Sequence, residues 1–414
     1  MALILYAIPM FLLLIAIELW VDHKRGSAYY RFNDAINSLS LGMVSRFTGV
    51  LKAILPFSIY IYIYNQWALF DLSQGIVAWV VAFVLYDMAY YWAHRFNHRI
   101  SVMWGSHVVH HNSEEYNLTT ALRQTSSPSL FAWLVYLPLA VIGIDPIIFI
   151  SCASLNLIYQ FWVHTRHVDK MPAWFEAIMV TPSHHRVHHA LNRDYIDKNY
   201  AGVFIIWDKL FGSFQAEKDD INIVYGVSNQ LSSWNPIWAN LQVYWQLMLD
   251  AWRTRNIVDK FKVFFMPPGW RPEDVNQQYP RGYVTTKTMV KYDVELSSRM
   301  KQYIIAQFVL MMPVTILFLL AIPNLSFLAM VFVALSSIGS LVIISGLQEQ
   351  KPWIVWAEPM RILFVSIIFY VLLSTYTQAP LIQGIGIFTL IQWALFYRLF
   401  RAPSSPVADG EGAS

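Results

Sequence analysis

Cysteine and charge are what this sequence has least of. Its 414 residues include one cysteine, Cys152, so the chain alone forms no intrachain disulfide, no cysteine-rich zinc site and no cysteine-ligated iron–sulfur cluster. Only 13% of the residues are charged, against roughly 25% in a soluble globular protein. A net charge of +3 without a sustained basic run excludes the electrostatic footprint of a nucleic-acid-binding protein. With 56% hydrophobic and 16% aromatic residues, the composition is typical of an integral membrane protein.

Basic residues are absent from five long stretches, and these gaps predict a multi-pass topology, since a membrane-spanning helix needs about 20 apolar residues. The first gap, from Met1 to about Val21, lacks the basic start and cleavage site of a signal peptide and is interpreted as a retained anchor. The stretch 129–163 contains a Gly-Ile-Asp-Pro break and either spans the membrane or is re-entrant. The other gaps predict apolar segments at about 47–64, 75–93, 303–322, 326–346, 362–376 and 380–397.

The predicted far-side loops contain no Lys or Arg, which fixes the expected orientation. By the positive-inside rule, the basic loops and the C-terminal tail face the cytoplasm and the N-terminus lies outside. Residues 215–300 form the only sizeable polar stretch, and within it IWANLQVYWQLMLDAW has the pattern of an interfacial amphipathic helix. The expected fold is therefore all-α, a polytopic membrane helical bundle with a cytoplasm-facing, histidine-rich di-metal domain.

This organisation predicts five parts. They are N-terminal membrane helices at 1–75, a metal-binding domain at 76–215, a cytoplasmic or interfacial segment at 216–300, C-terminal membrane helices at 301–400 and a disordered tail at 401–414. No internal repeat is visible. The compartment follows from the host: the endoplasmic reticulum in a eukaryote and the inner membrane in a bacterium.

Histidine is the one abundant metal-ligating side chain. Eleven of the 12 histidines lie between His94 and His189. Residues spaced i, i+3 and i+4 share a helix face, so each short histidine motif presents two or three imidazoles together. On the predicted topology, all of these motifs lie near the cytoplasmic ends of spans. The histidines that fit the pattern are His94, His98, His107, His110, His111, His164, His185, His188 and His189.

Nine imidazoles exceed what a single metal ion binds. Neutral imidazole suits iron, zinc or copper, whereas magnesium and calcium prefer oxygen ligands. Because one ion takes roughly four to six donors, the set predicts two ions, and nitrogen pockets with open positions favour redox iron that binds dioxygen. Zinc hydrolysis is the main chemical alternative, but the sequence contains no HExxH motif.

Three histidines lie outside this pattern. His23 stands beside Lys24 and Arg25 and is expected to face lipid headgroups. His167 follows His164 at i+3 and is a weaker candidate ligand. His184 is either a further ligand or a residue that supports the ligands or faces the substrate.

The motifs HxxxH, HxxHH and a final HxxHH resemble the signature of the fatty acid hydroxylase and sterol desaturase superfamily of membrane di-iron oxygenases. The surrounding segments WGSHVVHHNSEEYNLTTALRQ, FWVHT and TPSHHRVHHALNRDYIDKNYAGVFIIWDKLFGSF are most similar to the alkylglycerol monooxygenases and their bacterial relatives. The resemblance covers about residues 80–215. Arg166 stands where an acidic residue is expected after His-Thr, and Ala190 stands where glycine commonly follows the last histidine pair.

This resemblance implies an activity and a cofactor set. The enzyme would use dioxygen at a di-iron site to hydroxylate the carbon next to a glyceryl ether oxygen, and the product would collapse to a fatty aldehyde and glycerol. The resemblance also implies tetrahydrobiopterin as the reductant and maps the family's metal ligands onto the nine histidines. The runner-up activity is hydroxylation or desaturation of a sterol or a fatty acyl lipid.

Several carboxylates near the histidines are candidates for roles in the site. Glu114 and Glu115 would orient a ligand imidazole or hold a proton; the alternative is that they and Ser113 cap a helix beginning near Tyr116. Asp197 would line the site or form a turn. Asp87 and Glu18 lie within predicted spans, where charged residues are usually paired or functional, and Asp87 is a candidate support for the ligands.

Two questions stay open at the level of sequence. A membrane metal carrier is the alternative of another class, although carriers place ionisable residues near the midplane and these histidines gather at one face. The electron source is also open, because the sequence has neither a glycine-rich dinucleotide motif nor a cysteine cluster. Reducing equivalents must therefore come from a diffusible cofactor or from an electron-donor protein.

Overall fold

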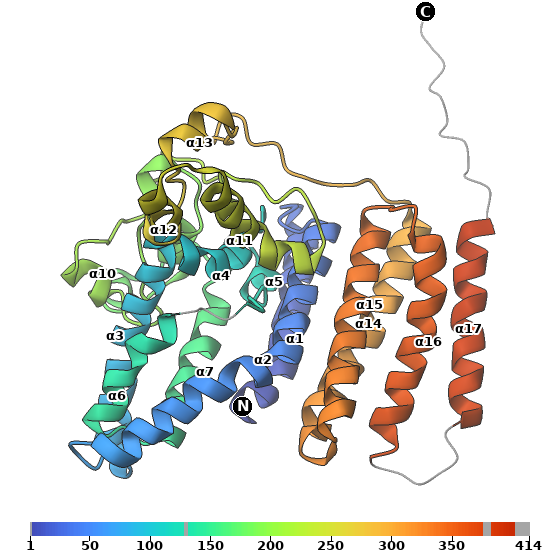
Figure 1. The fold of residues 1–414 in the computed structure, drawn as a ribbon, viewed down its shortest axis with the longest axis horizontal. Helices are drawn as coiled ribbons and strands as arrows, with labels where there is room; N and C mark the ends of the chain where they lie inside the picture. Colours follow the sequence, from blue (N-terminus) through green and yellow to red (C-terminus); the bar gives the residue numbers. More distant parts are fainter. Residues whose placement is uncertain (1, 128–130, 376–381, 402–414) are drawn as a thin grey trace, which may run out of the picture. The chain divides into compact units, whose positions relative to one another are not determined.

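The computed structural model describes residues 2–127, 131–375 and 382–401, and its regular elements are helices (Figure 1). The chain divides into two compact units, Met1–Asp293 and Val294–Ser414. No β-strand forms within the described ranges, where extended segments meet only in isolated bridges. These observations confirm the all-α prediction. The division into five parts stays a prediction, and the tail beyond Arg401 lies outside the described residues.

The first unit holds the long N-terminal helices and the helices that carry the histidines. Its elements are α1 (Ala2–Arg25), α2 (Phe32–Trp67), α3 (Gly75–Arg99), α4 (Ser101–His111), α5 (Leu118–Ala121), η1 (Ala132–Tyr136), α6 (Leu137–Ile142), α7 (Pro146–Trp162), α8 (Ala173–Glu176), α9 (Pro182–His188), η2 (Arg193–Tyr195), α10 (Ile206–Leu210), α11 (Pro236–Arg253), α12 (Ile257–Phe265) and α13 (Glu273–Gln278).

Among the described residues, five helices are long and apolar enough to cross a membrane, which confirms the prediction of a multi-pass membrane protein. They are α1, α3, α14 (Ser298–Ala321) with the η3 turn (Ile322–Asn324), α15 (Phe327–Gln348) and α16 (Ile354–Leu373). The two halves of α2 meet at 53° and together would make a sixth span. In the predicted 129–163 hairpin, the apolar helices Ala132–Ile142 and Pro146–Trp162 are shorter than the roughly 20 residues of a full crossing.

The prediction for α2 was wrong about where the helix begins. The apolar run starts at about residue 47, but the helix starts at Phe32. Its first turns carry the polar side chains of Asp34, Asn37 and Ser38, which are buried against the rest of the unit instead of facing water. Ser113 donates a hydrogen bond to Asp34 over 2.6 Å, and Arg123 donates one to Ser38. Tertiary packing therefore extends this helix beyond its apolar segment.

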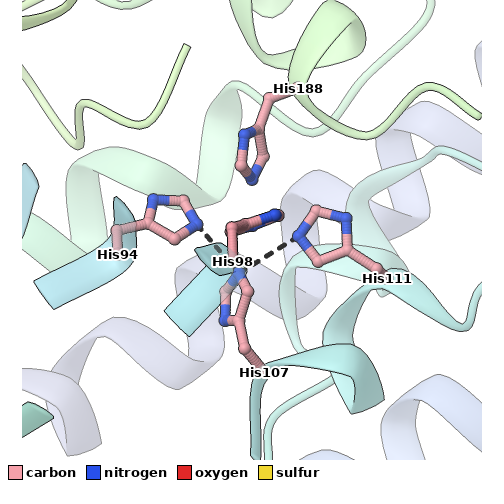
Figure 2. A group of neighbouring side chains, drawn as sticks. All are labelled: His94, His98, His107, His111 and His188. Carbon is pink, nitrogen blue, oxygen red and sulfur yellow. Dashed lines mark hydrogen bonds between the residues drawn. The ribbon is translucent and has the colours of Figure 1, made fainter. Parts of the chain in front are cut away.

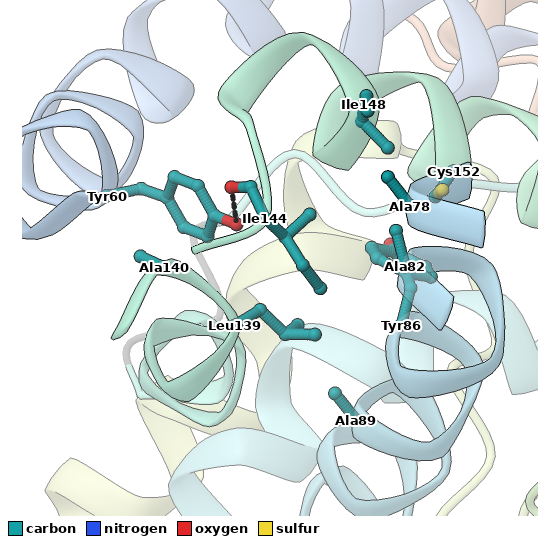
Figure 3. Close-up of a cluster of buried hydrophobic side chains, with 10 residues drawn as sticks. All are labelled: Tyr60, Ala78, Ala82, Tyr86, Ala89, Leu139, Ala140, Ile144, Ile148 and Cys152. Atoms are coloured by element: carbon teal, nitrogen blue, oxygen red, sulfur yellow. Dashed lines mark hydrogen bonds between the residues drawn. The ribbon is translucent and has the colours of Figure 1, made fainter. Parts of the chain in front are cut away.

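Small residues bring the helices of the apolar core together (Figure 3). On α3, Ala78, Ala82 and Ala89 are spaced by four and seven residues and face α6 and α7, so these helices approach closely. The Gly-Ile-Asp-Pro break separates α6 from α7: Gly143 has a φ of +105°, and Asp145 caps α7 by accepting from the backbone of Ile147 over 2.7 Å.

The second unit consists of α14, α15, α16 and α17 (Ile382–Arg401), and it encloses a buried ion pair. Arg361 donates to Glu358 through Nε over 2.7 Å, and Tyr303 donates to the same carboxylate over 2.5 Å. Arg361 also donates to Gln307, which in turn donates to Gln392 over 2.7 Å. These contacts join α14, α16 and α17 through one polar network that is screened from lipid.

Breaking this network should destabilise the protein. Arg361→Met leaves the Glu358 carboxylate buried without its cation, which should lower the free energy of unfolding by about 3–5 kcal/mol. The double variant Glu358→Leu/Arg361→Met removes both charges and should recover most of that loss. The exposed Arg398→Met is the matched control and should change stability by at most about 0.5 kcal/mol. Unfolding of the detergent-purified chain measures all four proteins, and equal stability of wild type and Arg361→Met would contradict the expectation.

Candidate metal centre

The end of α3 and the whole of α4 supply the first group of imidazoles. His94 and His98 lie one turn apart on α3, and α4 begins directly after Ile100 and presents His107 and His111 on one face. His188, the last residue of α9, completes the group. Figure 2 shows the five rings with their nitrogens turned toward one another. Their candidate ligand atoms all lie within 4.8 Å of one another.

A second group contains the remaining four predicted ligands, His110, His164, His185 and His189. Each HxxHH motif is thus divided between the groups. In the first motif His107 and His111 belong to the first group and His110 to the second, and in the last motif His188 belongs to the first group and His185 and His189 to the second. The His111 and His189 rings stack at a centroid distance of 4.3 Å and join the two groups. The structure therefore brings all nine predicted histidines together, as two adjacent sets.

Backbone carbonyls hold four of the rings by Nδ1. His94 donates to the Tyr200 carbonyl over 2.6 Å and His164 to the Gln160 carbonyl over 2.7 Å. The same arrangement joins His188 to Lys198 over 2.9 Å and His110 to Arg123 over 3.0 Å. A carbonyl only accepts, so Nδ1 carries the proton, and a neutral ring then has an unprotonated Nε2. This is the tautomer that binds a metal through Nε2.

The Nε2 atoms approach one another more closely than neutral rings without a cation would favour. The His110 and His164 Nε2 atoms are 3.1 Å apart, although both rings carry their proton on Nδ1, so two lone pairs face each other. Two imidazole nitrogens that bind one ion at about 2.1 Å, with an N–metal–N angle of about 90°, are about 3 Å apart. In addition, Nε2 of His98 and of His188 is buried without a hydrogen-bond partner in the described part of the chain. The donor set therefore fits metal ions.

Burial keeps these imidazoles neutral. It lowers the pKa of His110 to about 4 and that of His188 to about 3. The pKa values of His107, His111 and His185 are also lowered, first by burial and then by the neighbouring rings. A neutral ring is the form that ligates a metal, so proton competition is weak at neutral pH.

Glu114 and Glu115 are buried but face cations. Glu115 accepts from Arg31 over 2.8 Å, from Arg166 over 2.7 Å and from Lys291 over 2.5 Å. Glu114 accepts from Arg31, from Gln230 and from the Tyr292 backbone. Burial raises the pKa of Glu114, against the opposing effect of these partners. Both carboxylates thus tie the start of α2 and the segment around residue 291 to the loop that follows α4.

The expected helix cap near Tyr116 was wrong, and the unusual Arg166 has its contacts in this network. Ser113 does not cap a helix at Tyr116; the helix is α5, and Asn117 caps it by accepting from the Thr119 backbone over 3.1 Å. Arg166, which departs from the family pattern, donates to Glu115 and to the Tyr116 carbonyl and lies over the Tyr29 ring at 4.0 Å. Arg166 is therefore occupied in holding the His164 loop.

Asp197 and Asp87 contact the segment that follows α9 and belong to neither imidazole group. Asp197 has a φ of +61° and accepts from Arg99 over 2.6 Å, and the next carbonyl along the chain, that of Lys198, accepts from His188. Asp87 is fully buried on α3 and accepts from the backbone of Val203 and Phe204 and from the Trp207 indole, each over 2.9 Å. Both carboxylates fix the backbone that follows α9.

Neither His184 nor His167 belongs to the two groups. His184 is buried against Phe214 at a ring distance of 5.6 Å. His167 lies 3.5 Å from Asp22 of α1 and beside the Tyr29 ring. On α1, Glu18 accepts from Thr165, Tyr30 and the Leu118 backbone, so the first helix is fixed to the residue that follows His164.

Sequence reasoning missed the cavity and the aromatic rings next to the histidines. A cavity of about 360 Å³ reaches His98, His111, His188 and His189. Trp104 lines it and lies 5.1 Å from the His98 ring; its position three residues before His107 on one helix face was the available signal. Tyr116 lies 5.3 Å from the His189 ring. Polar groups line other parts of the cavity, among them Arg99, Asp197, Asn229, Gln246, Arg281 and Tyr283.

Comparison with known proteins agrees with the site. A family model described as fatty acid hydroxylase matches residues 79–213. Alkylglycerol monooxygenase from Homo sapiens is 39% identical over 312 residues, which cover 74% of this chain and 68% of the relative. The protein of that name from Danio rerio is 35% identical over 375 residues, covering 87% and 81%. Lathosterol oxidase from Homo sapiens is 26% identical over 144 residues, covering 34% and 46%. No solved structure matches.

The matched region contains all nine histidines of the two groups. The similarity to the alkylglycerol monooxygenases extends well beyond that region and includes most of both chains. The resemblance inferred from the histidine motifs is thereby confirmed. The chain belongs to the alkylglycerol monooxygenase family, a group of oxygen-dependent oxidoreductases that share the fatty acid hydroxylase domain.

Proposed function

We propose that this protein is a membrane di-iron monooxygenase that cleaves the ether bond of alkylglycerols. The observation that carries the proposal is the pair of converging imidazole groups, in which the Nε2 lone pairs of His110 and His164 face each other without a proton between them. The names and coverage of the relatives support the ether lipid as substrate. Each of the nine histidines holds one of two irons, and His184 and His167 hold neither.

The reaction balances with dioxygen and a two-electron donor. The irons, held by the nine histidines, would supply the activation of dioxygen: one oxygen atom would enter the C–H bond next to the ether oxygen, and the other would leave as water. Tetrahydrobiopterin would supply the two electrons and two protons and leave as a dihydropterin. The hydroxylated product is a hemiacetal, which breaks its C–O bond to give a fatty aldehyde and glycerol.

The residues of the chain orient the ligand imidazoles, admit the substrate and position the segments around the site. The carbonyls of Tyr200, Gln160 and Lys198 fix the ligand tautomers. The cavity beside Trp104 gives the substrate access to the first group. Glu114, Glu115 and Asp197 position the surrounding segments through their cations. For Glu114 and Glu115 this role differs from the holding of a proton that the sequence suggests as one alternative.

The site faces the cytoplasm in this proposal. The positive-inside distribution of Lys and Arg supports that orientation, with the endoplasmic reticulum as the compartment in a eukaryote and the inner membrane in a bacterium. On that face the reductant is a diffusible cytoplasmic molecule, and an electron-donor protein is the alternative.

Metal content tests the two groups separately. The purified wild-type chain should contain two irons, while His188→Ala in the first group and His110→Ala in the second should each lose iron and turnover. The exposed His23→Ala is the control for a histidine outside both groups, and His184→Ala should also retain two irons. Iron is measured by elemental analysis against protein. Retention of two irons and full turnover in His110→Ala would contradict the ligand assignment.

Product analysis tests the substrate. A radiolabelled alkylglycerol with tetrahydrobiopterin and oxygen should give a labelled fatty aldehyde, and leaving out the pterin should abolish it. Sterols and acyl lipids are offered in parallel, with the His188→Ala protein as a blank. Turnover of a sterol or an acyl lipid without any aldehyde from the ether would overturn the ether assignment while leaving the di-iron site in place.

A third test separates a positioning role for Glu115 from a proton-transfer role. Glu115→Gln weakens contacts to Arg31, Arg166 and Lys291 and should lower the free energy of unfolding by about 3 kcal/mol. The protein that stays folded should keep its irons and most of its kcat. A proton carrier would instead lose roughly a hundredfold or more in kcat at unchanged stability. The exposed Glu273→Gln is the matched control.

A further inference from the structure

The α11 helix has two different faces. Val243, Gln246, Leu247 and Asp250 line the cavity that reaches the histidines. The other face exposes apolar side chains at spacings of three and four residues, which form one stripe along the helix. They are Trp238, Leu241, Trp245, Met248 and Trp252, with exposed fractions from 37% to 84%.

The α12 helix, which packs against α11, also exposes apolar side chains. Ile257, Phe261 and Phe265 are 59% to 70% exposed, while Val263 is fully buried. Together with Lys262 and Met266, these side chains line a shallow apolar groove. We call the exposed apolar side chains of α11 and α12 the aromatic face. Exposed aromatic and aliphatic side chains gathered on two helices that pack together are costly in water, which indicates that something covers them.

The charges around the aromatic face favour a lipid surface as its cover. The segment holds four basic side chains, Arg253, Arg255, Lys260 and Lys262. Its two acidic side chains are compensated: Asp250 is buried and paired with Arg271, and the partly buried Asp259 lies 3.9 Å from Lys262. Lys260 donates to the carbonyls at the end of α11. An apolar face with Trp and Phe and a basic margin is the pattern of a helix that lies in the plane of a membrane with anionic headgroups.

The position of α12 along the chain supports the same cover. The candidate span α3 ends at Arg99, and two residues later Ser101 donates from its backbone nitrogen and its hydroxyl to the Met266 carbonyl, over 3.0 and 2.8 Å. Met266 is the C-cap residue of α12. The end of α12 is therefore hydrogen-bonded to the point at which a membrane helix ends, which is the level of the headgroups.

We propose that the aromatic face is an in-plane membrane surface and that a single-chain amphiphile enters the cavity from the lipid past it. The segment Pro267–Trp270, directly after α12, lines the same cavity, so lipid-covered and cavity-lining residues are adjacent in the chain. The substrate part of this inference rests on the proposed function. The membrane part does not, because it concerns only what covers the aromatic face.

Spin labels measure the cover directly. The native cysteine is fully buried, so the wild-type chain is the background control for labels on Met248→Cys, Trp252→Cys and Phe261→Cys. Glu273→Cys on α13 is the matched control in water. The full chain is placed in phosphatidylcholine and phosphatidylglycerol nanodiscs, and relaxation by oxygen is compared with relaxation by a water-soluble nickel chelate.

Oxygen should relax the three labels on the aromatic face more strongly than nickel, and the control should show the reverse. Nickel access equal to that of the control would overturn the proposal. Poor access for both agents, with spin–spin broadening, would also overturn it, since it would identify a second copy of the chain as the cover.

Kinetics tests the entry of substrate. The double variant Trp252→Glu/Phe261→Glu should raise the KM for an alkylglycerol embedded in vesicles by about tenfold, since charges oppose insertion of the face. Its iron content and its kcat toward a short-chain alkylglycerol in water should be unchanged. Gln278→Glu on α13 is the charge control. An unchanged KM in vesicles would overturn lipid-side entry. Absence of any turnover by the wild type would count against the proposed function alone, because the spin-label result does not depend on it.

Discussion

The structure depends on one electrostatic constraint: unprotonated imidazole nitrogens that face one another in a buried site. His110 and His164 each commit their proton to a carbonyl, and their Nε2 atoms remain 3.1 Å apart. In water such rings would separate or take up a proton. Here burial lowers the pKa of His110 to about 4, so protonation does not relieve the repulsion at neutral pH. A bound cation does, and it converts a destabilising arrangement into a stabilising one.

The surrounding architecture keeps those nitrogens from relaxing. The carbonyl that accepts from His94 belongs to Tyr200, whose own backbone nitrogen donates to Asp208 over 2.8 Å. Asp87 holds the next turn by accepting from Val203 and Phe204. The buried carboxylates of Asp208 and Asp87 thus accept hydrogen bonds from the backbone segment that orients the His94 ring. Such support explains why carboxylates lie close to the metal centre without belonging to either imidazole group.

Much of the site was predictable from spacing, because helix periodicity alone places imidazoles at i, i+3 and i+4 on one face. The division of each HxxHH motif was not predictable, since it depends on where α7 and α9 lie around α4. The carbonyl partners of Nδ1 leave no trace in the sequence, because every residue carries the same carbonyl. The polar start of α2 was missed for a related reason. Polar residues such as Asp34 and Ser38 are expected to face water, and only the structure shows that they are buried against Ser113 and Arg123. Five of the predicted apolar spans, whose signal is local, correspond to candidate membrane helices among the described residues.

The number of ligands in each group bears on where the chemistry takes place. Five imidazoles of the first group and four of the second supply no negative charge, and the buried carboxylates Glu114 and Glu115 are paired with Arg31, Arg166 and Lys291. Two ions held this way would keep their full positive charge in a buried setting, which would favour binding of oxygen donors at the remaining positions. A six-coordinate ion would have one open position in the first group and two in the second. The cavity borders both groups, at His98 and His188 and at His189, so both groups can be reached from the same cavity. An all-nitrogen ligand set with fewer than six donors would leave coordination positions open for dioxygen. This arrangement fits the proposed lipid monooxygenase better than it fits storage or transport of the metal.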